Sequence, residues 1–588
     1  MWVMFMLKEL QKLMKKEKID YYIIPTDDDH QSENVGEYFQ ARKYFSGFTG
    51  SAGTLLVTQK NAYLWTDGRY FIQAANELYD GIELMKMNTE GYPSLLEFLA
   101  SHVQSYQTVA FDGKTMNTKF VYNLMDSFPF DLNIQCCDLV TPIWKDRPAM
   151  ACHKAYLYDI KYHGIETKEK IDMIREYMKV NNCDAHVITA LDDIAWIFNI
   201  RGKDIESTPV VLAYALITMD NAYLYLQDDA YDEEIKNFLR DQGVIIKDYY
   251  DIFDDAYDLD GTVLLDLANI NYELMNQINC DVVDAPNPSQ YFKSIKNKVE
   301  IQNTINAHIK DGVAVTKFMY WLKKNINKIE MDEISVDEIL TSFRAQQDLF
   351  IEPSFTTISA YEENAALMHY HATKEHCTKL QPKGFLLVDS GGHYYDGTTD
   401  ITRTFVLGDI TDIQRKHFTL VLKGMLNLQR AKFLYGQTGI DLDCIARYPM
   451  WNEGIDYQCG TGHGVGHLLC VHEGPNEFRP KPRTGTPVVL EEGMLTTDEP
   501  GIYLEGQYGI RLENELLCQK DIKNEYGQFM SFKCLTLVPI DLDGIDVNML
   551  AYDEKEALNA YHKEVYDTIS PYLNEEEKDW LKEYTRSI

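Results

Sequence analysis

The chain has 588 residues, of which 45% are hydrophobic and 25% charged, a composition typical of a soluble globular protein with two to four domains. Its formal net charge of −35 argues against a nucleic-acid partner, because a phosphate backbone requires clustered lysine and arginine. No run of about 18 apolar residues occurs, so we expect no membrane partner either.

The N-terminal segment is predicted to be an amphipathic helix and not a signal peptide. It begins with apolar residues, but it lacks a basic start, and Lys8 and Glu9 interrupt its short hydrophobic stretch. Leu7, Leu10 and Leu13 instead form a helical stripe. Eleven cysteines, an odd number without a CxxC pair, fit reduced thiols, so we expect a cytoplasmic protein.

The first half of the chain contains short sequence strings that recur as in an internal repeat. The segment IDYYIIPTDD (19–28) follows a helical stretch, as does CDAHVITALDD (183–193). The string NAYL begins an apolar strand at residue 61 and again at residue 221, so the two offsets, 164 and 160 residues, nearly agree. Chance similarity of short strings is the alternative, but the shared order and context favour two related α/β domains.

Breaks in the pattern suggest the domain boundaries. Residues 144–164 contain proline and lack periodicity, as expected of a linker, and a second break lies at 284–289. Residues 296–325 then have the apolar spacing of a long amphipathic helix. The charged tail from Asp553 is expected to form a solvated pair of surface helices. The predicted domains are 1–155, 156–292 and 293–588.

The C-terminal third places acidic residues where strands should be apolar. Asp389 ends the apolar strand FLLVD, and Asp400 opens the next strand, so a hairpin would bring the two side by side. Glu499 and Glu513 are expected on two more strands around a turn, each flanked by apolar residues. His463 lies between glycines in the stretch QCGTGHGVGHLLCVHEGP.

These five side chains form a candidate metal site. Buried carboxylates are costly unless a cation neutralises them. Two Asp, two Glu and one His suit Mn²⁺, Co²⁺, Fe²⁺ or Zn²⁺ and offer too few thiolates for a structural zinc site. Two ions about 3.5–4 Å apart could share the carboxylates and produce hydroxide near neutral pH, which predicts amide or ester hydrolysis. Acids at ordinary glycine-rich turns are the alternative, which three such motifs within 125 residues disfavour.

The motifs VDSGGHYYDGTTDITRT, GTGHGVG, VHEGP, TDEPG and GIRLEN, in this order, resemble the pita-bread metallopeptidases. They are most similar to the three-domain, cytosolic form of aminopeptidase P, the Xaa-Pro aminopeptidases. FSGFTGSAGTLLV, TDGRYFIQAA, TALDDIAWIFNIRG, AHIKDGVAV and LTLVPIDL extend the resemblance over nearly the whole chain. It implies an α/β protein with two creatinase-like N-terminal domains and a C-terminal pita-bread catalytic domain.

The resemblance also implies a function. Such an enzyme releases the N-terminal residue from peptides with proline second, through a hydroxide that bridges two divalent metal ions. We expect Mn²⁺, with Zn²⁺ or Co²⁺ as alternatives, and a homodimer formed through the catalytic domain. By motif, Asp389 would be a terminal ligand of one metal, Asp400 and Glu513 would bridge both, and His463 and Glu499 would complete the other. Glu499 would also be the general base.

Further roles follow from the same resemblance. His369 and His472 would lie beside the metals, hold the scissile carbonyl and pass protons. Arg511, two residues before Glu513 on the same strand face, would orient the acidic cluster, and Arg69 would reach the substrate site from the N-terminal domain. Cys459 stands where the family usually has another histidine, and a neutral thiol cannot replace an imidazolium as a charged donor. This departure puts one wall of the substrate pocket in doubt.

Two alternatives stay open. Prolidase cleaves Xaa-Pro dipeptides but usually has one N-terminal domain, and creatinase and methionine aminopeptidase fit less well for the same reason. A metal-free peptide- or histone-binding protein of the same fold would have lost its ligands, whereas all five positions are intact here. His393 and His467 match no role in the family and are expected to be structural or exposed.

Overall fold

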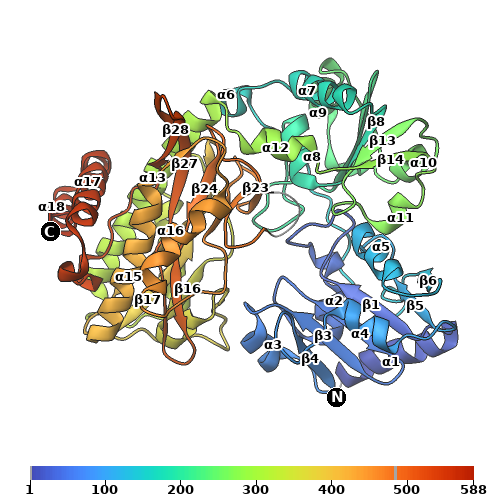
Figure 1. The fold of residues 1–588 in the computed structure, drawn as a ribbon, viewed down its shortest axis with the longest axis horizontal. Helices are drawn as coiled ribbons and strands as arrows, with labels where there is room; N and C mark the ends of the chain where they lie inside the picture. Colours follow the sequence, from blue (N-terminus) through green and yellow to red (C-terminus); the bar gives the residue numbers. More distant parts are fainter. Residues whose placement is uncertain (1–2, 483–486) are drawn as a thin grey trace. The chain divides into compact units, whose positions relative to one another are not determined.

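The computed structural model describes the chain except residues 1–2 and 483–486. Among the described residues, no helix combines the length and apolar character needed to cross a bilayer. In Figure 1 the chain runs from blue to red, and it divides into two compact units. The first unit holds the chain up to Tyr158 and Ile165–Ser289; the second holds Asp159–Gly164 and Gln290–Ile588.

The first unit contains two six-stranded mixed sheets with the same strand order (Figure 1). One runs β4 (Ile82–Lys86), β3 (Ala62–Thr66), β2 (Thr54–Thr58), β1 (Tyr21–Pro25), β5 (Thr108–Phe111), β6 (Asn133–Cys136). The other runs β12 (Val244–Asp248), β11 (Ala222–Leu226), β10 (Ala213–Thr218), β8 (Ala185–Ile188), β13 (Thr262–Leu265), β14 (Asp281–Asp284). In each, the first strand in the chain pairs antiparallel on one side and parallel on the other. This identity of topology supports the predicted duplication.

Helices flank both sheets. The predicted N-terminal helix is present, and its Leu10 and Met14 are buried as the apolar stripe requires. The helices of the first unit are α1 (Val3–Glu17), α2 (Ala41–Ser46), α3 (Phe71–Glu77), α4 (Leu95–His102), α5 (Thr118–Asp126), α7 (Thr167–Val180), α8 (Leu191–Phe198), α9 (Glu233–Asp241), α10 (Asp251–Tyr257) and α11 (Tyr272–Met275).

The two halves of the first unit meet through equivalent positions. Asn117 precedes α5, Asn271 precedes α11, and the two residues form a β-bridge with each other. Each side chain caps its own helix, accepting from the N–H of Phe120 or of Leu274. The Asn271 amide also donates to the carbonyl of Asp29 at 2.8 Å. The repeated halves therefore contact each other through the same capping residue.

The predicted linker at 144–164 is partly regular. Its residues Tyr156–Leu157 form β7, which pairs antiparallel with β9 (Ile200–Arg201). Residues 160–163 form α6 (Ile160–His163), which belongs to the second unit. A short strand and a single helical turn carry too little periodicity to be visible in the sequence.

The described residues of the second unit form four sheets. The largest runs β21 (Lys432–Leu434), β28 (Gly527–Cys534), β27 (Asn514–Asn524), β24 (Leu495–Asp498), β22 (Gly462–Gly464), β23 (Glu473–Phe478). The others are β16 (Ile358–Tyr361), β17 (Phe385–Ser390), β20 (Ile401–Val406); β15 (Phe350–Pro353), β18 (Gly392–Tyr394), β19 (Gly397–Thr398); and β25 (Gly501–Leu504), β26 (Tyr508–Arg511).

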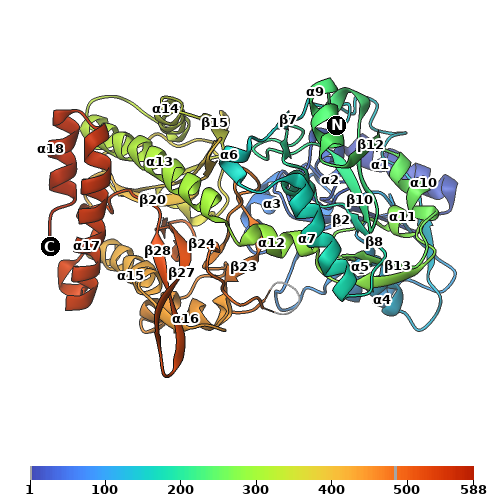
Figure 2. The same cartoon turned by 90° about the horizontal axis from the view of Figure 1, so that it is seen from above.

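The described part of this unit also contains six long helices (Figure 2). The predicted amphipathic helix is α13, which begins two residues later than expected behind a capping box at Asn297. The helices are α13 (Lys298–Asn325), α14 (Glu333–Arg344), α15 (Asp412–Gln429), α16 (Gly439–Trp451), α17 (Tyr552–Ile569) and α18 (Glu575–Tyr584).

The predicted solvated tail is wrong in one respect. Its helices α17 and α18 form as expected, but they are amphipathic and pack against α13, with α17 also against α15 (Figure 2). Leu558, Val565 and Ile569 of α17 and Leu581 of α18 are fully buried in the main core of the unit. The high charge of the tail concealed this apolar face, because charged residues occupy the opposite side of each helix.

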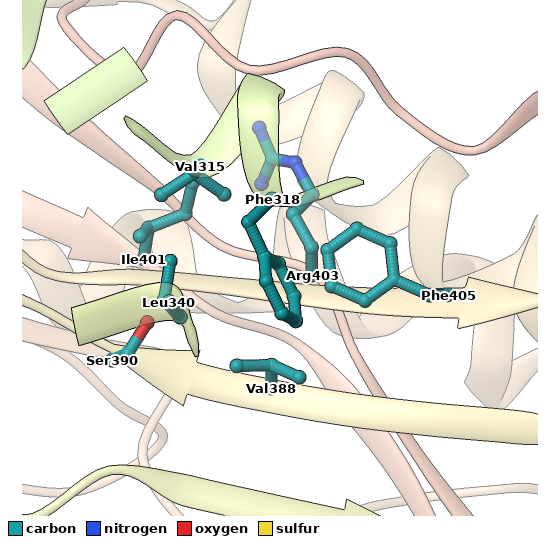
Figure 3. A pocket seen from close by; sticks show the side chains of 8 residues that line it. All are labelled: Val315, Phe318, Leu340, Val388, Ser390, Ile401, Arg403 and Phe405. Atoms are coloured by element: carbon teal, nitrogen blue, oxygen red, sulfur yellow. The ribbon is translucent and has the colours of Figure 1, made fainter. Parts of the chain in front are cut away.

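Strands β17 and β20 pack one face against α13, and the acidic residues lie on the other face. Figure 3 shows a small pocket on one face, where Val388 of β17 and Ile401 and Phe405 of β20 meet Phe318 of α13. Successive side chains of a strand point to opposite faces, so Asp389, which follows Val388, points away from this pocket. The residues that line the pocket are Val315, Phe318, Leu340, Val388, Ser390, Ile401, Arg403 and Phe405.

Candidate metal centre

The first acidic pair lies on the face of β17 and β20 that points away from α13. The strands pair antiparallel with Asp389 opposite Thr402, and Asp400 immediately precedes β20. The two strands therefore pair as predicted, but they are not joined by a simple hairpin turn. The intervening residues form β18 and β19, which pair with each other within the β15 sheet.

The second acidic pair lies where β24 and β27 meet. Asp498 pairs with Asn514, so Glu499 directly follows one strand and Glu513 directly precedes the other. The sequence predicted two strands here, but the structure has four, since β25 and β26 form a hairpin between them. Pro500 accounts for the first interruption, because it has no N–H to donate to a strand ladder.

Both pairs converge with His463 of β22. The candidate ligand atoms of Asp400, His463 and Glu513 all lie within 4.8 Å of one another. His463 Nε2 lies 3.5 Å from Asp400 Oδ2 and 3.4 Å from Glu499 Oε1. Asp389 is close enough for its charge to act on Asp400, Glu499 and Glu513. The structure therefore brings all five predicted ligands to one place.

The tautomer of His463 suits metal coordination through Nε2. Its Nδ1 lies 2.9 Å from the carbonyl oxygen of Gly464, which can only accept a hydrogen bond. Nδ1 therefore carries the hydrogen, and the lone pair on Nε2 faces the carboxylates. A main-chain acceptor on the far nitrogen is a common way to fix a metal-binding imidazole.

The electrostatics of the cluster favour a bound cation. Burial, followed by the charges of neighbouring carboxylates, raises the pKa values of Asp400 and Glu513 well above their usual range. Burial also raises the pKa of Glu499 to about 7, although the Arg511 guanidinium lowers it in part. The raised pKa values mean that these carboxyl groups tend to hold protons, and a bound cation would neutralise the same carboxylate charges instead.

Arg511 contacts the acidic cluster directly. The sequence placed it on one strand with Glu513, but Arg511 ends β26 and its Nη2 donates to Asp389 Oδ2 at 2.5 Å. Its Nη1 donates to the hydroxyl of Tyr503 at 2.7 Å, and its Nε donates to Thr402. Sequence reasoning missed Tyr503, although it lies two residues after the glycine of the TDEPG motif.

The candidate substrate histidines differ in how well they are placed. The rings of His472 and His463 pack edge to face with centroids 4.4 Å apart, and the charge of His472 lowers the pKa of Glu499. His369 lies in the loop between Ala366 and β17. His371, two residues further along the same loop, was not predicted as a site residue. It hydrogen-bonds the main chain of Thr357 and interacts with the charge of Asp389.

The remaining predicted residues lie in different surroundings. Burial, followed by the charge of Glu499, raises the pKa of Cys459 to about 11, so its thiol is neutral at physiological pH. His467 contacts the Thr304 hydroxyl and the Tyr162 carbonyl through its two ring nitrogens, as a structural histidine would. Arg69 belongs to the first unit, where it donates to Asp67 through two nitrogens.

The residues present fit two divalent cations. The donor set is rich in carboxylate oxygen with one imidazole, as divalent transition metals prefer. Asp389 Oδ1 is buried and has no hydrogen-bond partner among the described residues, so it is available to a cation. Glu499 and His463 are partly exposed, with side-chain fractions of 21% and 18%, which leaves the cluster open to solvent on one side.

Comparisons with known proteins identify the domains of the chain. Models of the creatinase/prolidase N-terminal domain match residues 6–147 and 146–300, and the model of metallopeptidase family M24 matches residues 302–520. The model of the C-terminal region of peptidase M24 matches residues 528–588. These matches confirm the predicted α/β architecture of two creatinase-like domains and a pita-bread metallopeptidase domain.

Relatives match over the full length. A probable Xaa-Pro aminopeptidase P of Ajellomyces dermatitidis is 36% identical over 99% of this chain and 98% of that protein. Aminopeptidase P1 of Arabidopsis thaliana is 33% identical over 99% of both. The crystal structure of the Caenorhabditis elegans X-prolyl aminopeptidase, described as a cytosolic enzyme with a di-nuclear active site, superposes with a TM-score of 0.94, 32% identity and full coverage of both chains.

Prolidase is the more distant likeness. The prolidase of Pyrococcus horikoshii is 24% identical, covers 64% of this chain and 99% of its own, and superposes with a TM-score of 0.50. That similarity concerns the fold alone. The shorter coverage agrees with the argument that a prolidase has one N-terminal domain fewer.

The raised pKa values predict how pH affects the stability of the metal-free protein. Above the ordinary glutamate pKa of 4.5 and up to about 7, folded Glu499 holds more protons than unfolded Glu499, so stability falls as pH rises through this window. Bound Mn²⁺ would remove that penalty. We expect Mn²⁺ to raise the melting temperature of chelator-treated protein more at about pH 8 than at about pH 5, measured by calorimetry. An equal gain at both pH values would contradict this account.

Proposed function

The chain belongs to the Xaa-Pro aminopeptidase P family of M24 metallopeptidases, and on this premise we propose that it removes the N-terminal residue from peptides whose second residue is proline. It is accordingly a metal-dependent hydrolase of the aminopeptidase class. The observation that carries the proposal is the convergence of Asp400, His463 and Glu513 within 4.8 Å, with Asp389 and Glu499 acting on the same cluster.

We assign the five ligands to two divalent cations, with Mn²⁺ as the first candidate and Zn²⁺ or Co²⁺ as alternatives. Asp389 would hold one ion, Asp400 and Glu513 would be shared, and His463 and Glu499 would complete the second set. When bound, two such ions lower the pKa of a water molecule shared between them, so that hydroxide forms near neutral pH, and they polarise the scissile carbonyl.

We assign the role of general base to Glu499. Its carboxylate is partly exposed and lies 3.4 Å from His463 and 3.3 Å from the Thr497 hydroxyl, which helps to orient it. Glu499 would take a proton from the attacking water and later deliver it to the proline nitrogen, which must be protonated to leave. The Arg511 guanidinium, held by Asp389 and Tyr503, would restrain the cluster during this exchange.

The histidines would act on the substrate carbonyl. His472 packs against His463, so its ring could donate to the oxyanion that forms on attack. His369 would contribute in the same way from its loop. Arg69 is proposed as a weaker substrate contact on the basis of the family resemblance. The neutral thiol of Cys459 lies near Glu499, and it would leave this part of the site without the charge that an imidazolium would supply.

We also propose the wider setting of the enzyme. The division into domains at 1–155, 156–292 and 293–588 is supported by the limits of the family models. A cytoplasmic location is supported by the description of the C. elegans enzyme as cytosolic. The homodimer rests on the family resemblance, and light scattering at micromolar concentration would show a mass of two chains if it forms and of one chain if it does not.

Replacement of Glu499 tests the general base. Glu499→Gln keeps the shape and removes the proton acceptor, so we expect turnover to fall at least about 10²-fold while the melting temperature stays close to that of the parent chain. The assay should use protein whose metal content has been measured. Near-normal turnover in fully loaded Glu499→Gln protein would remove Glu499 from this role.

Three peptides separate the proposed function from its alternatives. After chelation and addition of Mn²⁺, Zn²⁺ or Co²⁺, we expect cleavage of a Gly-Pro-Xaa tripeptide and none of a Met-Ala-Xaa peptide, measured by chromatography of the products. Cleavage of the Gly-Pro dipeptide alone would identify a prolidase. Failure to cleave any of them with any metal, while the tripeptide still binds, would identify a peptide-binding protein.

A further inference from the structure

Glu515 is a buried acid beside the metal centre that the assigned ligands do not include. It lies on β27, two residues after Glu513, and its side chain is fully buried. Its Oε1 accepts a hydrogen bond from the main-chain N–H of Asp400 at 2.7 Å. The second oxygen, Oε2, has no hydrogen-bond partner among the described residues. Glu515 therefore contacts the main chain of a predicted bridging ligand without being a ligand itself.

A buried histidine on α13 holds Glu515 from the other side. His308 Nε2 lies 3.0 Å from Glu515 Oε1, and His308 Nδ1 lies 2.8 Å from the Thr304 carbonyl. Both ring nitrogens thus face oxygen acceptors. Burial alone would lower the pKa of His308, but the charge of Glu515 beside it raises the pKa above its ordinary value. The pair links α13 to the residue that opens β20.

The far end of β20 has a matching arrangement. The N–H of Val406 donates to Asp541 Oδ2 at 2.8 Å, and Asp541 pairs with Lys323, which also lies on α13. His308 and Lys323 are 15 residues apart, about 22 Å along a helix. Asp400 and Val406 are six residues apart, about 20 Å along a strand. One helix therefore fixes both ends of one strand, each through a buried carboxylate that accepts a main-chain N–H.

We propose that Glu515, held by His308, is a positioning residue that fixes the Asp400 main chain and thereby sets the affinity of the centre for divalent cations, whereas Asp541 and Lys323 only stabilise the fold. The inference rests on the proposed assignment of Asp400 as a ligand. Partners behind the ligands commonly control metal affinity, because they fix the direction in which each ligand points. Only the pair at the Asp400 end of β20 can do so.

Two conservative substitutions separate positioning from charge balance. Glu515→Gln loses the charge but keeps an oxygen at the reach needed to accept the Asp400 N–H. Glu515→Asp keeps the charge but is one methylene shorter, so its oxygens withdraw from that N–H. If Glu515 positions Asp400, the Asp variant weakens Mn²⁺ binding about 10–100-fold and the Gln variant binds nearly as the parent chain does. If Glu515 only balances charge, the order is reversed.

The experiment titrates chelator-treated full-length chains with Mn²⁺ by calorimetry and records the melting temperature of each metal-free variant. Asp541→Asn and Asp541→Glu are the matched controls at the other end of β20. We expect them to lower the melting temperature and leave Mn²⁺ affinity unchanged. His308→Leu, which removes the partner of Glu515, is expected to weaken Mn²⁺ binding as Glu515→Asp does.

Each outcome decides the question. Equal Mn²⁺ affinity in the parent and Glu515→Asp chains would overturn the inference, and so would an equal loss of affinity in the Asp541 variants. A parent chain that binds no divalent cation would overturn both this inference and the metal assignment. A parent chain that binds two Mn²⁺ but cleaves no peptide would refute the proposed function alone, and the order of the Glu515 variants would still decide the role of Glu515.

Discussion

The candidate metal centre of the second unit is built from several carboxylates that are buried close together. Asp400, Glu513 and Glu515 are 4% exposed or less, and Asp389 is 9% exposed. Such groups repel one another strongly where water is excluded. Among the described residues, Arg511 pairs with Asp389 and His308 lies beside Glu515, whereas Asp400 has only the His463 imidazole, 3.5 Å away. The arrangement is stable in the charged form only if further positive charge is bound, which is what a dinuclear site provides.

The apolar side of β17 and β20 makes this burial possible. Val388, Ile401 and Phe405 pack against α13 and α14, so the alternate residues must face the opposite side. Sliding either strand by one residue would bury Asp389 or Asp400 among these apolar groups, where no cation could reach it. The hydrophobic packing therefore fixes the register, and the register places the ligands. Hydrogen bonds at both ends of β20 then hold the strand along its length.

The sequence singles out the candidate ligands because they break an otherwise regular pattern. Asp389 lies within an apolar strand, and Asp400, Glu499 and Glu513 lie directly at strand ends, so these acids are visible without a structure. Contacts between segments that are far apart in the chain were harder to predict from the sequence. Arg511 was assigned to the strand of Glu513, but its guanidinium binds Asp389, 122 residues away in the chain. Periodicity can place a side chain on a face, but it cannot say which other strand meets that face.

Glu515 shows why one acid in a motif can be overlooked. Glu513 directly precedes β27 and Glu515 lies on it two residues later, so the sequence presents both acids in the same short segment. The known family motif ends at Asn514, and Glu515 followed it as an ordinary strand residue. Its importance depends on two segments far away, α13 and the start of β20, which meet it only in the fold. A buried acid that accepts a main-chain N–H loses that bond if the strand shifts, so Glu515 makes the position of Asp400 costly to change. The fold that buries these carboxylates together therefore also fixes the position of Asp400, through its hydrogen bond to Glu515.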